Sequence, residues 1–150
     1  MTTAGMTTAD MTTIDVLKAL ADETRLRMVS LLAESDDLCG CELEAVLQLQ
    51  QSNASRHLSR LRSAGVVGAL KSGQWVHYSL SPPQAYAEVT RRVIETARSE
   101  DERFMRDLRR MHDYRESPFT CRNIWEWVEL RDGGSGAYRS PQKATGSRLF

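Results

Sequence analysis

Apolar residues recur three and four positions apart along most of the chain, and this spacing is typical of helices that bury one face. A first helix is expected to begin near Ile14, with Thr13 as its N-cap. A second is expected to begin at Asp22 or Glu23, because negative charges suit the positive end of the helix dipole. Further helices are expected at 38–47, 51–64 and 84–114. The pattern predicts a mainly α-helical protein.

Two short runs depart from helical spacing and predict a β-hairpin. Residues 66–70 and 75–80 are rich in β-branched and aromatic side chains, and they flank a turn at 71–74 in which Gly73 supplies the permissive backbone. Just before them, two helices follow each other across a short polar turn, which is the order of a helix-turn-helix. The predicted fold class is therefore mainly α with a β-hairpin wing, a dimeric winged helix-turn-helix.

The segment 84–114 contains no Gly or Pro and predicts one long helix of about 25 to 30 residues. A domain of this size cannot easily bury such a helix internally. We therefore expect the helix to pair with a second copy of the chain, so that 14–114 forms the winged domain with its dimerisation helix. The alternative is a helix packed only within its own subunit.

The two ends of the chain have a different composition. Residues 1–13 are a five-residue near-repeat of low complexity and are expected to be disordered. An apolar C-terminal element that carries Cys121 is expected at 115–131, and a flexible Gly-rich tail at 132–150. No export signal and no membrane-spanning run is present, so a cytoplasmic location is expected.

Charge is distributed in a way that predicts a nucleic-acid interface. The chain is neutral overall, yet no Asp or Glu occurs between Ala45 and Ala87, where several Arg and Lys residues lie. The outer face of the 51–64 helix offers hydrogen-bond donors and cations that can reach bases and phosphates, and the wing adds Lys71 near its tip. The residues of that helical face are Gln51, Ser52, Ser55, Arg56 and Arg60.

Cys39 and Cys41 are separated only by Gly40, at the expected start of a helix, where backbone N–H groups favour a thiolate. In a chain without an export signal, closely spaced thiols more often bind metal or sense redox state than form structural disulfides. The pair therefore predicts a soft-metal or metalloid site. Redox sensing and simple packing are the alternatives.

Four segments together resemble the ArsR/SmtB family of metal- and metalloid-sensing repressors, and the arsenite-sensing members most closely. They cover about 16–80 and read LKALADETRLRMVSLL, DLCGCEL, QSNASRHLSRLRSAGVV and GQWVHYSL. The resemblance implies a homodimer that leaves operator DNA when a metal or metalloid binds. It further implies a readout helix with Ser52, Asn53, Ser55, Arg56 and His57, and a wing at 71–75 that includes Gln74.

The chain departs from the arsenite-sensing pattern at one position. A third cysteine is expected three residues after Cys41, and Glu44 stands there. Trivalent arsenic is a soft ion that three thiolates hold best, so Cys121 is the candidate third ligand, from the same or the partner subunit. Otherwise Cys121 is a buried small hydrophobe. The 84–114 helix has no His pair, which argues against the family's zinc or cobalt site.

The sequence thus predicts a transcriptional repressor released by trivalent arsenic or antimony, with no permanent cofactor. Cadmium or lead are alternative inducers, since they too prefer thiolates. A redox-sensing repressor is another alternative, in which Cys121 pairs with one of the other cysteines. An enzyme is disfavoured, because the chain has no phosphate-binding glycine loop, nucleophile elbow or acid–base pair with a His at useful spacing.

Overall fold

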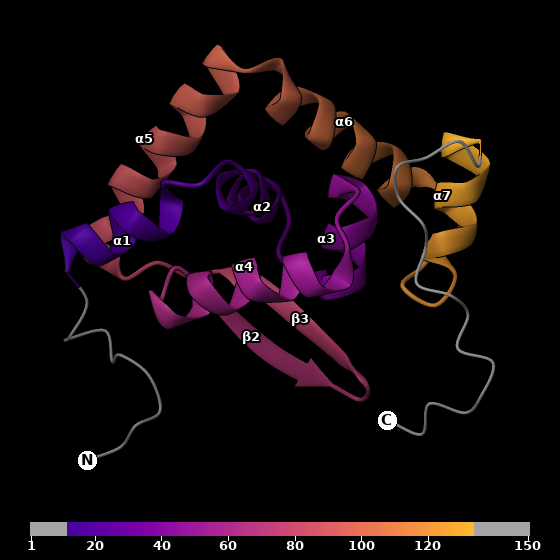
Figure 1. Ribbon diagram of the computed structural model, residues 1–150, viewed down its shortest axis with the longest axis horizontal. Helices are drawn as coiled ribbons and strands as arrows, with labels where there is room; N and C mark the ends of the chain where they lie inside the picture. The colour runs from indigo at the N-terminus through magenta and orange to yellow at the C-terminus, as the bar shows by residue number, and fades with distance from the viewer. Residues whose placement is uncertain (1–11, 134–150) are drawn as a thin grey trace.

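The computed structural model describes residues 12–133, and the expectations for 1–11 and 134–150 lie outside them. The predicted winged helix-turn-helix is confirmed: most of the described chain is helical, and a small antiparallel sheet follows the helix pair (Figure 1). The elements are α1 (Thr13–Leu20), α2 (Glu23–Glu34), β1 (Leu38–Cys39), α3 (Gly40–Leu47), α4 (Gln51–Ser63), β2 (Val67–Ser72), β3 (Trp75–Leu80), α5 (Gln84–Glu100), α6 (Glu102–Glu116) and α7 (Ile124–Asp132).

Local sequence signals place the helix ends. The N-cap of α1 is Thr12, which forms a reciprocal capping box with Asp15, so the predicted N-cap Thr13 was wrong by one residue. Helix α4 ends in a Schellman arrangement: Gly65 has a φ of 71°, its amide donates to the carbonyl of Arg62, and that of Val66 donates to Leu61. This ending turns the chain directly into the wing.

The sheet has one strand that the spacing did not predict. Strand β1 pairs with β3, in the order β1-β3-β2, and Cys39 lies opposite His77. The prediction that the helix already begins at Leu38 was therefore wrong, because Leu38 and Cys39 are extended and α3 starts at Gly40. The predicted wing turn is tighter than expected: Ser72 pairs with Trp75 and only two residues connect the strands, with Gly73 at a φ of 61°.

The predicted single helix at 84–114 was wrong. Asp101 has extended backbone angles, ends α5 and caps α6 by accepting a hydrogen bond from the amide of Arg103. The break lets α6 turn back over α2 (Figure 1), where Arg27 makes two hydrogen bonds of 2.7 and 2.8 Å to the buried carboxylate of Asp107. A straight helix could not bury both of its halves against the same small body.

Buried side chains form two hydrophobic clusters. The larger cluster joins the helices α1, α2, α3 and α4, the base of the wing and parts of α5 and α6. The smaller consists of Ala45, Tyr114, Ile124, Trp127 and Val128, and it holds α7 against α3 and α6. None of the described helices is both long and apolar enough to cross a membrane.

Candidate metal centre and DNA-reading surface

Cys39 occupies a junction between two elements. It is the last residue of β1 and the N-cap of α3, and its amide donates a 2.9 Å hydrogen bond to Glu42 Oε1. Cys41 lies one residue into the helix, and Gly40 between them carries no side chain to separate the two thiols. The Sγ atoms of Cys39 and Cys41 are 2.7 Å apart.

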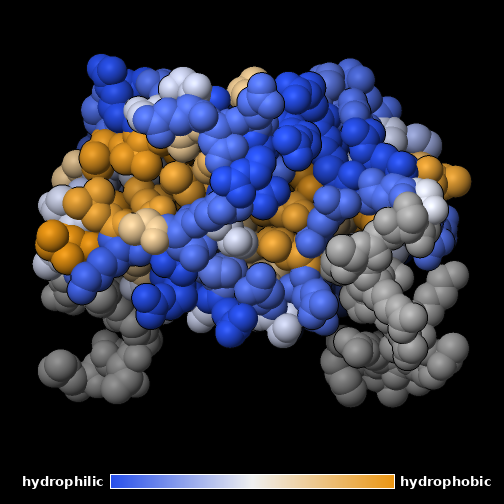
Figure 2. Space-filling view, turned by 45° about the horizontal axis from the view of Figure 1, so that its top comes forward, coloured by the Kyte–Doolittle hydropathy of each residue, from blue (hydrophilic) through white to orange (hydrophobic). Residues whose placement is uncertain are grey.

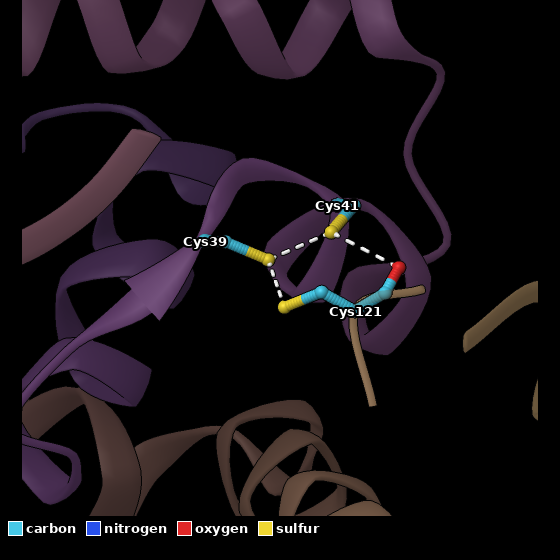
Figure 3. Close-up of side chains that lie close together, drawn as sticks. All are labelled: Cys39, Cys41 and Cys121. Carbon is cyan, nitrogen blue, oxygen red and sulfur yellow. Dashed lines mark hydrogen bonds between the residues drawn. The ribbon is translucent and has the colours of Figure 1, made fainter. Parts of the chain in front are cut away.

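The structure brings Cys121 to this pair within the same chain. Cys121 lies in the loop between α6 and α7, and its Sγ is 2.7 Å from that of Cys39 (Figure 3). The Cys41 thiol also points toward the Cys121 carbonyl, 3.9 Å away. All three sulfur atoms lie within 4.8 Å of one another, so a single ion could reach every one of them.

The position of Cys121 depends on how α7 is anchored. Trp127 packs edge-on against Tyr114 with ring centroids 5.3 Å apart, and the guanidinium groups of Arg110 and Arg131 lie over its ring at 4.9 and 5.5 Å. Arg110 also makes two 2.7 Å hydrogen bonds to the carboxylate of Asp132. These contacts fix the middle and the C-terminal end of α7, and the loop that presents the third thiol precedes this helix.

Hydrogen bonding within the cluster distributes charge unevenly among the thiols. The thiols of Cys39 and Cys41 donate to Cys121 and lower its pKa to about 3. The same hydrogen bonds to Cys121, together with burial, raise the pKa values of Cys39 and Cys41. Cys121 is therefore the most acidic of the three thiols, and a cysteine with a lowered pKa reacts readily with a soft electrophile.

A cavity of about 560 Å³ opens beside Cys39 and Cys41, between α3, α4 and the wing. Glu44, the residue at the position expected for a third cysteine, lines this cavity and is only 8% exposed. Burial raises the pKa of its carboxyl group to about 7. Sequence reasoning treated Glu44 only as a missing ligand, and no local pattern indicated that its side chain would be buried.

The predicted DNA-reading residues share one surface. Gln51, Ser52, Ser55, Arg56 and Arg60 are exposed on α4, and Lys71 and Gln74 are exposed at the tip of the wing. Asn53 is half-buried and accepts a 3.2 Å hydrogen bond from Arg56. His57 differs from the others, because its Nδ1 faces α2 and lies 3.3 Å from the guanidinium of Arg25 and 3.6 Å from Asp22.

The sequence pattern described as "Bacterial regulatory protein, arsR family" matches residues 22–68. The arsenical resistance operon repressor of Escherichia coli is 41% identical over 113 residues, which are 72% of this chain and 94% of that protein. The chain belongs to the arsR family. The arsenic resistance transcriptional regulator ArsR1 of Pseudomonas putida is 39% identical over 108 residues, 71% of this chain and 84% of the relative.

A solved structure supports the fold. HlyU from Vibrio cholerae superimposes with a TM-score of 0.50 at 36% identity, over 58% of this chain and 89% of that chain. Membership of the arsR family makes the protein a transcriptional repressor that binds operator DNA, and not an enzyme. The matched family segment contains Cys39, Cys41 and α4 but ends well before Cys121.

Proposed function

We propose that this arsR-family repressor leaves its operator when trivalent arsenic or antimony binds Cys39, Cys41 and Cys121 of one subunit. The observation that carries the proposal is the convergence of three thiols from two distant segments onto one point. Three thiolates suit a soft ion that forms three bonds. With arsenous acid, each thiol would replace one hydroxide, so that three As–S bonds form and three water molecules leave without any redox change.

The geometry offers a direct route from the thiols to the DNA-reading surface. Cys39 pairs with His77 of the wing strand β3, and it also caps α3, which packs against α4. An ion that pulls on Cys39 would therefore act on the wing and on the readout helix together.

On DNA, α4 would enter the major groove with Gln51, Ser52 and Ser55 near base edges and Arg56 and Arg60 near phosphates. Lys71 and Gln74 would bring the wing to the adjacent backbone. Asn53 would orient Arg56 through their hydrogen bond. We assign His57 the smallest share of the contact, since its Nδ1 faces Arg25 and Asp22.

We also propose that the protein acts as a homodimer formed through α1 and α5. Ile14 and Leu17 on α1 are 58% and 41% exposed, and hydrophobic surface gathers on the left of Figure 2, where α1 and α5 lie in Figure 1. A second copy would cover this surface and place two readout helices on a palindromic site. Sedimentation analysis of Leu17→Glu should give a monomer, whereas Leu130→Glu, on exposed α7 surface, should stay dimeric.

The function is tested by fluorescence anisotropy of reduced protein on its own promoter fragment during arsenite titration. Wild-type protein should leave the DNA at low arsenite. Cys39→Ser should bind DNA normally and resist release, and Cys121→Ser should need at least tenfold more arsenite. Arg122→Ser is the matched control, because its exposed side chain neighbours Cys121 without joining the cluster. Equal arsenite sensitivity of Cys121→Ser and wild type would contradict the three-thiolate site.

Two further titrations separate the alternative inducers. Release by cadmium or lead at lower concentration than by arsenite would reassign the ion but keep the site. Release by a disulfide-forming oxidant alone would make the cluster a redox switch, in which Cys39 and Cys121, with sulfurs 2.7 Å apart, would form the disulfide. The proposal requires arsenite or antimonite to act in the presence of reductant.

A further inference from the structure

The cavity beside the thiols has a lining that the three-thiolate site does not need. Cys39 and Cys41 reach it from one side, and Gln51, Ser55 and Gln74 line it from α4 and the wing. An arsenic ion held by three sulfurs requires no space of about 560 Å³ next to it. The space is large enough for a small organic molecule attached to the metalloid.

Glu44 gives this cavity a chemical preference. It is the only charged residue among the described residues that line the cavity, it is only 8% exposed, and its carboxylate makes no hydrogen bond or ion pair within the described part of the chain. A buried carboxylate without a partner is destabilised until a cation reaches it. The side chain thus favours a ligand that carries a positive charge.

Aromatic side chains strengthen the same preference. Trp75 and Tyr78 from β3 and Trp125 from α7 line the cavity together with Glu44. Aromatic faces attract ammonium groups, and a carboxylate combined with aromatic rings is a common arrangement for binding them. Neutral or anionic ligands would gain nothing from this combination.

We propose that the cavity binds the ammonium group of a small aminothiol that delivers the metalloid as its thiolate complex. The inference rests on the proposed function, because it describes how the inducer reaches Cys39, Cys41 and Cys121. The thiol groups and the ammonium site lie side by side, so one complex could engage both.

The delivery step is a thiol exchange. A cysteine sulfur of the protein forms a bond to arsenic and one As–S bond to the aminothiol breaks. The departing thiolate takes up the cysteine proton or, where the cysteine is already ionised, a proton from water. Repeating the step three times transfers the ion and releases three aminothiols. Arsenic stays trivalent throughout, and no oxidant or reductant is consumed.

The test measures the rate of operator release by stopped-flow anisotropy at pH 8, with arsenite preloaded on a thiol in excess. The probes are cysteamine, which is cationic, N-acetylcysteamine, which is neutral, and mercaptoacetate, which is anionic. Each rate for wild type is divided by that for Glu44→Gln, so that differences in the reactivity of the thiols cancel. We expect a ratio of about ten for cysteamine and about one for N-acetylcysteamine.

A control variant and a second comparison on wild type keep the test decisive. Glu129→Gln removes an exposed carboxylate on α7 and should leave all ratios at about one. If Glu44→Gln fails to fold, the rates measured on wild type alone still test the proposal. Each rate is first divided by the rate at which the same arsenite complex exchanges with a model dithiol. After this correction, cysteamine should deliver arsenite to wild type faster than N-acetylcysteamine does. Equal corrected rates, or equal ratios for all three probes, would overturn the proposal.

A metalloid-free arm distinguishes this inference from the proposed function. S-methylcysteamine cannot exchange thiols, but it carries the same ammonium group and should quench tryptophan fluorescence saturably in wild type and not in Glu44→Gln. If arsenite fails to release DNA while this binding is seen, the proposed function is wrong and the ammonium site stands. If arsenite releases DNA and S-methylcysteamine does not bind, the proposed function stands and the ammonium site is wrong.

Discussion

The two hydrophobic clusters of the molecule differ in size and in what they support. The larger cluster joins helices α1, α2, α3 and α4, the base of the wing and parts of α5 and α6, so it supports the elements that carry the proposed DNA contacts. The smaller cluster has five buried members around Trp127, and it carries α7 and the position of Cys121. The third thiol is therefore held by a separate, small core. Damage to that core should reduce sensing before it reduces DNA binding.

The largest effect is expected from the main cluster. Leu61 is fully buried on α4, so Leu61→Ala removes packed methyl groups and leaves a cavity that should cost about 3 kcal/mol of unfolding free energy. Urea denaturation measures the loss, and operator affinity should fall with it. Leu130→Ala, at a site that is 75% exposed, is the matched control and should change stability by less than about 0.5 kcal/mol.

Trp127→Ala should show that the two clusters lose stability independently. Its ring packs against Tyr114 and under two guanidinium groups, but α7 can open locally, so the global cost is expected to be about 2 kcal/mol. Hydrogen exchange should increase in α7 while the amides of α4 stay protected. Operator affinity should be unchanged, and arsenite sensitivity should fall to that of Cys121→Ser. Loss of DNA binding in parallel would mean that the clusters are one cooperative unit.

Glu44→Gln should give the smallest change, and one that depends on pH. The pKa of the Glu44 carboxyl is raised to about 7 in the folded protein by burial, from 4.5 in the unfolded chain. The folded state binds more protons between these values, so wild-type stability falls as pH rises from about 4.5 to 7. The variant should equal wild type in stability at low pH and be more stable than wild type at pH 8. Unfolding curves at both pH values give the comparison, and a pH-independent difference would contradict it.

The helix-turn-helix and the wing could be predicted from sequence because their signals are local. Ala54, Leu58 and Leu61 are spaced for one buried helix face, Gly65 ends that helix, and Gly73 turns the hairpin, all within a short continuous segment. Each signal involves neighbours along the chain, so no knowledge of tertiary packing was needed. The family resemblance covered the same segment and pointed to the same residues.

The sensing half was less predictable because its contacts are distant. Cys121 meets Cys39 across 82 positions, and the tertiary packing of α7 in the smaller cluster brings them together in one chain. The break at Asp101 had a local signal, an Asp followed by Glu in a helix-capping position, but the absence of Gly and Pro outweighed it. Strand β1 is too short for a recognisable alternation, and pairing with β3 is what creates it.

The central claim is that Cys121 completes a three-sulfur site. Arsenic X-ray absorption spectroscopy on the reduced, arsenite-loaded protein counts the sulfur neighbours directly. We expect three sulfur neighbours in wild type, and two sulfurs with one oxygen in Cys121→Ser. Two sulfurs and one oxygen in wild type, unchanged in the variant, would show that Cys39 and Cys41 bind the ion without Cys121, and would contradict the account.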